Sequence, residues 1–142
     1  MIDGVLVTPL KRISGEAGAV LHGLKKSAPG YVGFGEAYFS EIHEGAAKGW
    51  RRHNRVTMNL VVVQGQVRFV LYDDRAGSQT RGKFSDIRIG QSFYARLTVP
   101  PGLWMCFRGE GPGTSLVLDI IEEEHDPAEA ETCDGSTIPF SW

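Results

Sequence analysis

The chain has 142 residues and a mass of 15.6 kDa, which suits one domain and excludes a second catalytic or binding domain. Its 42% hydrophobic and 23% charged residues are typical of a folded globular protein and exclude wholesale disorder. The formal net charge of -2 provides no bulk attraction for a polyanion, so we expect no nucleic-acid partner.

The numbers of glycine and cysteine residues indicate the fold class and the cellular compartment. Eighteen glycines favour many tight turns over long helices, and this predicts an all-β protein. Cys106 and Cys133 are too few for a disulfide scaffold or a four-cysteine zinc site, and two thiols suit a reducing cytoplasm. The N-terminus lacks a basic stretch followed by an apolar block, and no apolar run approaches about 18 residues. We expect a cytoplasmic protein without a membrane partner.

Short β-branched and aromatic runs separated by turn residues predict a series of strands along the chain. The strongest signal is a pair of runs, 59–63 and 66–72, around Gln64-Gly65, which predicts a β-hairpin. Asp126-Pro127, with Glu129 three residues past the acid, predicts one short capped helix. Many short strands with turns between them favour a sandwich or closed barrel. The other expected strands are 33–42, 85–89, 93–99, 104–107 and 115–121.

One segment has the spacing of a cupin motif. Between Gly45 and Gly65, the positions that carry metal ligands in a cupin are Arg51, His53 and Met58. The ligand position after the turn Pro100-Pro101-Gly102 is Met105. Only one of these four residues is an imidazole, so the frame resembles a cupin barrel without its metal site. We expect no metal and no cofactor.

Seven motifs then occur in one order along the chain. Together they resemble the dTDP-4-dehydrorhamnose 3,5-epimerase family and its shorter relatives. The resemblance implies a single metal-free cupin jelly roll over residues 1–142, a homodimer, and activity on nucleotide-linked 4-keto-6-deoxy sugars. The motifs are 34–40, Lys48-Gly49-Trp50, 59–65, 72–75, 78–82, 99–104, and the ending His125-Asp126-Pro127 through 138–142.

The departures from the family fall on its reaction and phosphate sites. Arg51 stands where the family has its catalytic histidine, and Val117 where it has its tyrosine acid. Met105 replaces a histidine, Met58 a lysine, and Ala17 an arginine that holds phosphate. The resemblance therefore implies the fold, but it does not carry over the 3,5-epimerisation.

Epimerisation beside a ketone requires a base, a donor to the enolate oxygen, and an acid on the other face. Arg51 can supply the donor but not the base, because guanidinium stays protonated. Strand alternation places Arg51, His53 and Arg55 on one face, and Glu36, Tyr38 and Ser40 on one face of another strand. Asp119 lies either in a wet cavity or on a solvated face. The candidate catalytic residues are His53, Glu36, Tyr38, Arg51 and Asp119.

Among the candidate catalytic residues, we expect His53 or Glu36 to act as the base and Tyr38 to act as the proton donor. The resemblance places Lys48 at a phosphate-contacting position. Each assignment has a structural alternative, since His53 can be a satisfied structural histidine and the arginines a solvated edge. The candidate substrate-binding residues are Lys48, Arg55, Ser40 and Trp104, the last either a packing residue or a rim aromatic that stacks on the ligand.

Two functional hypotheses follow. In the first, the protein is a sugar-nucleotide epimerase or keto-isomerase that uses an altered set of acid and base residues. In the second, it is a catalytically silent cupin that binds a nucleotide-diphosphate sugar or pairs with an active homologue. Retention of poised acid and base groups favours the enzyme, whereas loss of the family's histidine and tyrosine favours the silent module. The retained groups are Glu36, Tyr38, His53 and Asp119.

Overall fold

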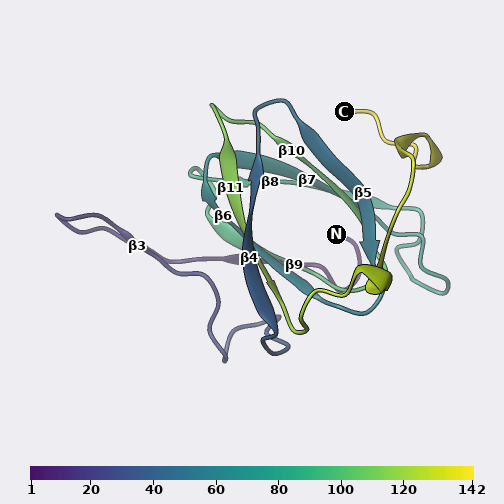
Figure 1. The fold of residues 1–142 in the computed structure, drawn as a ribbon, viewed down its shortest axis with the longest axis horizontal. Coiled ribbons are helices and arrows are strands. Elements are labelled where there is room, and N and C mark those ends of the chain that lie inside the picture. Colours follow the sequence, from purple (N-terminus) through teal and green to yellow (C-terminus); the bar gives the residue numbers. More distant parts are fainter.

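Two five-stranded antiparallel sheets face each other in the computed structural model, which describes all 142 residues (Figure 1). The spatial order of the first sheet is β1 (Leu6–Pro9), β9 (Ala95–Val99), β6 (Met58–Gln64), β11 (Ser115–Ile121) and β4 (Glu36–Ile42). That of the second is β12 (Ala130–Thr132), β5 (Ala47–His53), β10 (Trp104–Gly109), β7 (Gln66–Tyr72) and β8 (Phe84–Gly90). The predicted all-β sandwich is confirmed.

The core lies between the sheets and follows the two-residue period of the strands. On β11 the buried residues alternate with half-buried ones, so Val117, Asp119 and Ile121 face inward while Leu118 faces outward. A cluster of 18 buried apolar residues fills most of this space, with Leu60, Phe69 and others from both sheets. The cavity described below lies where polar side chains such as Ser40 and Asp119 replace apolar ones between the sheets.

The hairpin predicted around Gly65 is wrong. β6 pairs with β9 and β11 in the first sheet, whereas β7 pairs with β10 and β8 in the second. The turn therefore carries the chain from one sheet to the other. Gly65 adopts a φ of 82°, and a Cβ there would lie 2.1 Å from the Ser115 Oγ, so only glycine fits. Paired strands and strands that face each other across a core have the same kind of composition, so the residues of these two runs do not distinguish the two arrangements.

The predicted late helix is a single 3₁₀ turn, Pro127–Glu129, followed by a second short turn at Gly135–Thr137. Asp126 caps the first turn as expected, with its side chain accepting from the Ala128 amide. The Glu129 carboxylate does not reach back to the cap. It is turned toward β5, where it becomes part of the candidate site.

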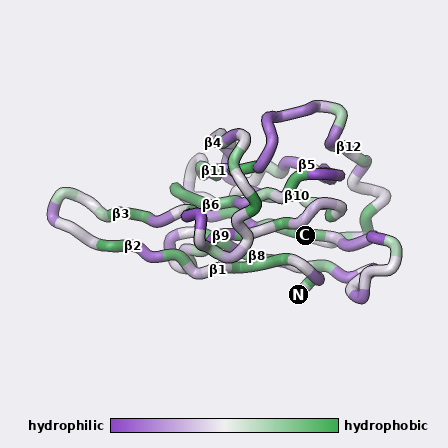
Figure 2. Tube along the Cα trace, turned by 90° about the horizontal axis from the view of Figure 1, so that it is seen from below, coloured by the Kyte–Doolittle hydropathy of each residue, from purple (hydrophilic) through white to green (hydrophobic).

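A small hairpin leaves the body of the protein. Strands β2 (Arg12–Ile13) and β3 (Val20–Leu21) pair only with each other and extend away from the sandwich (Figures 1 and 2). Ile13 and Val20 are 52% and 59% exposed, although both are apolar. The chain forms no helix with the length and hydrophobicity needed to span a bilayer.

Candidate active site

A cavity of about 340 Å³ opens between the two sheets, and it collects six of the nine candidate residues. Its walls come from β4 and β11 on one side and from β5, β10 and β12 on the other. The apolar part of the lining is Met105 and Phe107. The candidate residues that line it are Tyr38, Ser40, Lys48, Arg51, His53 and Asp119.

His53 is the last residue of strand β5, and one nitrogen of its ring is held by a hydrogen bond. Its Nδ1 hydrogen-bonds the Glu129 carboxylate, and the His53 side chain is 12% exposed. A carboxylate at Nδ1 favours the tautomer with the proton on that nitrogen. The other nitrogen, Nε2, is then left as an acceptor, which is the form a general base requires.

Glu129 is a residue that sequence reasoning did not place in the site. It is 5% exposed and accepts the backbone amides of Asn54 and Arg55 at 3.1 and 3.2 Å. Burial acts to raise the pKa of Glu129, but the hydrogen bonds from His53 and from the Arg55 and Val56 amides outweigh it and lower the pKa. The carboxylate is therefore a fixed negative charge behind the imidazole. The only sequence signal was its place after Asp126-Pro127, which we interpreted as a capping box.

Tyr38, Ser40 and Asp119 lie on the opposite sheet. Asp119 pairs in register with Tyr38 across β11 and β4, and its Oδ2 accepts from the Ser40 Oγ at 3.0 Å. Burial raises the pKa of Asp119 to about 6, and the Ser40 hydrogen bond partly offsets this. Burial and the nearby Asp119 raise the pKa of Tyr38 to about 12, so its phenol keeps its proton at neutral pH. The question left open for Asp119 is answered, since it lies in the cavity.

Two cations complete the lining. The Lys48 Nζ donates to the Glu41 carbonyl at 2.5 Å, and Arg51 forms no ion pair or side-chain hydrogen bond within the chain. A free guanidinium at the cavity wall can donate to an anionic oxygen of a ligand. Between them, Gly49 lets β5 approach β10, because a Cβ at this position would lie 2.5 Å from the Met105 carbonyl oxygen.

Three of the predicted residues lie outside the cavity. Arg55 follows the end of β5 and pairs with Glu123 at 2.8 Å, because the strand does not continue to it in register. Trp104 points from the outer face of the second sheet and donates to Asp74 at 3.1 Å. Neither Arg55 nor Trp104 lines the cavity, and the position of Trp104 agrees with its alternative as a packing residue. Glu36 also lies outside the lining and accepts the His125 amide at 2.7 Å.

The four cupin ligand positions do come together. Arg51, His53, Met58 and Met105 line one small recess beside the main cavity. Two thioethers and a guanidinium do not fit a divalent transition metal, and a single imidazole does not hold one. No group of three or more His, Cys, Asp or Glu side chains in the structure could hold a metal ion.

No protein-family model matches the chain. A solved dTDP sugar isomerase from Desulfovibrio desulfuricans G20 is 35% identical, superposes with a TM-score of 0.95, and is matched over 99% of this chain and 92% of its own. That agreement in sequence and fold shows the family. The chain belongs to the dTDP-sugar epimerase and isomerase family.

Two further comparisons agree with this family. The spore coat polysaccharide biosynthesis protein SpsL of Bacillus subtilis is 27% identical over 100% of this chain and 97% of its own length. A dTDP-6-deoxy-D-glucose-3,5-epimerase from Legionella pneumophila shares the fold, with a TM-score of 0.87 at 17% identity over 100% of this chain and 80% of its own. The resemblance to the 3,5-epimerases, the cupin fold and the class of enzyme, a sugar-nucleotide epimerase or isomerase, are confirmed.

Proposed function

We propose that the protein moves a carbon-bound proton on a nucleotide-diphosphate 4-keto sugar, without a metal, as an epimerase or keto-isomerase. The observation that carries the proposal is the cavity with His53 on one sheet, backed by Glu129 from the 3₁₀ turn, and Tyr38 with Asp119 on the other sheet. The 4-keto substrate class is supported by the solved Legionella relative, which was obtained in complex with dTDP-4-keto-L-rhamnose.

The proton transfer follows from these positions. The His53 Nε2 takes the proton from the carbon beside the ketone, and the electron pair moves to the ketone oxygen to form an enolate. Glu129 acts through His53, as a positioning residue, by holding the ring and offsetting the charge of the imidazolium. Tyr38 returns a proton from the opposite sheet, and this inverts the carbon when base and acid stand on its two faces.

The developing negative charge needs a donor that does not itself transfer a proton. Arg51 lies on the same face of β5 as His53 and has no carboxylate partner, so it can donate to the enolate oxygen or to the phosphates. Lys48 lines the same wall and adds positive charge for the diphosphate. Burial and the nearby Asp119 keep Tyr38 protonated, and Asp119 also holds Ser40 through its hydrogen bond.

The proposal includes a homodimer and a cytoplasmic location. The projecting β2–β3 hairpin exposes Ile13 and Val20, and the outer side of β4 exposes Phe39 at 61%. A second copy covering these apolar side chains would remove them from water. The two free cysteines, Cys106 and Cys133, suit a reducing compartment.

The deciding experiment measures proton exchange directly. The protein is incubated in deuterated solvent with dTDP-linked and other nucleotide-linked 4-keto-6-deoxy sugars, and deuterium on each ring carbon is measured by NMR. We expect incorporation beside the ketone, with loss by about 10²–10⁴ in His53→Asn and Tyr38→Phe. Inversion identifies an epimerase, and movement of the ketone identifies a keto-isomerase. Binding by calorimetry without any exchange would contradict the proposal and leave the silent binding module.

A further inference from the structure

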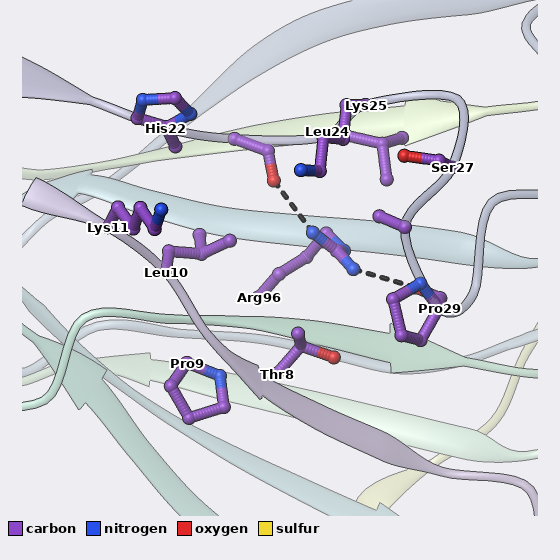
Figure 3. Close-up of a pocket in the computed structure, with 12 residues that line it drawn as sticks. Thr8, Pro9, Leu10, Lys11, His22, Leu24, Lys25, Ser27, Pro29 and Arg96 are labelled. Atoms are coloured by element: carbon purple, nitrogen blue, oxygen red, sulfur yellow. Dashed lines mark hydrogen bonds between the residues drawn. The ribbon is translucent and has the colours of Figure 1, made fainter.

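A second cavity, of about 320 Å³, lies on the outer face of the first sheet (Figure 3). Its walls are residues 8–11, at the end of β1, and the crossing segment 22–29. Arg96 of β9 reaches into it from below, because it alternates with Leu97, which faces the core. The sheet itself therefore separates this cavity from the candidate active site.

The lining of this second cavity is cationic. Arg96, Lys11 and Lys25 line it together with His22, and none of its 12 lining residues is an aspartate or glutamate. Cationic side chains that converge on a concave surface without acidic neighbours create a positive potential there.

Arg96 is the most deeply buried arginine, with 1% exposure, yet it has no carboxylate partner. Its three nitrogens donate to neutral oxygens: Asn59 Oδ1 at 3.2 Å, Gly23 O at 2.8 Å and Pro29 O at 2.7 Å. Burial lowers the pKa of Arg96, since no anion compensates the charge. The arginines that do pair with carboxylates are Arg52, Arg55, Arg68, Arg75 and Arg88.

A guanidinium has five N–H groups, and these three bonds leave two of them without a partner in the chain. We propose that the second cavity binds a phosphate group, either as inorganic phosphate or on a small phosphorylated metabolite. Arg96 contributes donors from the floor, while Lys11 and Lys25 contribute charge from the two walls. The volume admits a phosphate together with a group the size of a sugar.

Such a ligand would tie the crossing segment more firmly to the sheet. Arg96 already holds Gly23 and Pro29 of that segment, and the chain continues from it into β4, which carries Tyr38 and Ser40. Phosphate binding here is therefore expected to order the segment that leads into the candidate active site.

The test is an NMR titration of the ¹⁵N-labelled full chain with inorganic phosphate at constant ionic strength. We expect saturable shifts of the Gly23 and Gly30 amides at millimolar phosphate. The variant Lys11→Ala/Lys25→Ala removes two charge-assisted contacts and should weaken this binding by at least about tenfold. Lys26→Ala is the matched control, because Lys26 is exposed, neighbours Lys25 and does not line the cavity.

The two sources of phosphate are distinguished by repeating the titration with a hexose 1-phosphate. Tighter binding than inorganic phosphate identifies a metabolite site, and equal binding identifies a site for the ion. Phosphate in the catalytic cavity is recognised separately by shifts at Gly49, which lines that cavity. The proposal is overturned if residues 22–30 show no saturable shift, or if the double variant binds phosphate as tightly as Lys26→Ala.

Discussion

The pair formed by Glu129 and His53 makes the sharpest test of the site, through the isosteric change Glu129→Gln. The carboxylate now faces four donors: the His53 Nδ1 and the backbone amides of Asn54, Arg55 and Val56. A glutamine keeps one oxygen and replaces the other with an NH₂ group, so at least one of these donors loses its acceptor. If the NH₂ group faces His53, the imidazole must carry its proton on Nε2 and loses its function as a base.

Two magnitudes follow from this geometry. A hydrogen bond to a charged group contributes about 1.5–3 kcal/mol, so the free energy of unfolding should fall by about 1–3 kcal/mol. The rate of deuterium exchange into the 4-keto sugar should fall by about 10²–10⁴, as for loss of a positioned base. Urea denaturation measures the first quantity, and NMR in deuterated solvent measures the second.

The controls separate a positioning role from a structural one. Glu131→Gln changes an exposed carboxylate in the same segment, which pairs with Arg52, and it should leave exchange unchanged. If Glu129 acts through the imidazole, adding Glu129→Gln to His53→Asn should cause little further loss of rate. A Glu129→Gln protein that remains folded and exchanges deuterium at the wild-type rate would refute the reasoning.

Four other predictions address the metal, the buried acid, the turn between the sheets and the dimer. Elemental analysis should find no stoichiometric transition metal, and a chelator should leave exchange intact; about one metal per chain would contradict this. Because burial raises the pKa of Asp119 to about 6 from 3.8, the folded protein binds this proton more tightly than the unfolded chain, and stability falls as pH rises through that interval. Asp119→Asn should therefore gain about 2–3 kcal/mol in the free energy of unfolding above that interval and none at low pH, and a gain equal at both pH values would exclude this cause. Gly65→Ala should cost about 2–4 kcal/mol, since its Cβ would overlap Ser115, whereas Gly77→Ala, with a φ of 76° and open space, should cost only about 1–2 kcal/mol; equal losses would contradict the steric argument. Light scattering should give about twice 15.6 kDa, and Val20→Asp should shift the protein toward the monomer, whereas a wild-type monomer at micromolar concentration would exclude the dimer.

Periodicity and motif order were sufficient for the fold class and for the side chains that share a face on each wall of the site. A two-residue period assigns each side chain to a face, so Tyr38 and Ser40, and likewise Arg51 and His53, were predicted to share faces without knowledge of the sheet. The ordered motifs added the family, which composition alone did not indicate.

Only the tertiary structure decided which faces meet and where each strand stops. Glu129 reaches His53 from 76 residues away through a turn whose local pattern indicated only a cap. β5 ends at His53, so Arg55 leaves the cavity face, and β6 and β7 separate into different sheets although their residues suit a hairpin. These outcomes depend on pairings between segments far apart in the chain, and a local pattern determines the face of a residue but not its partner.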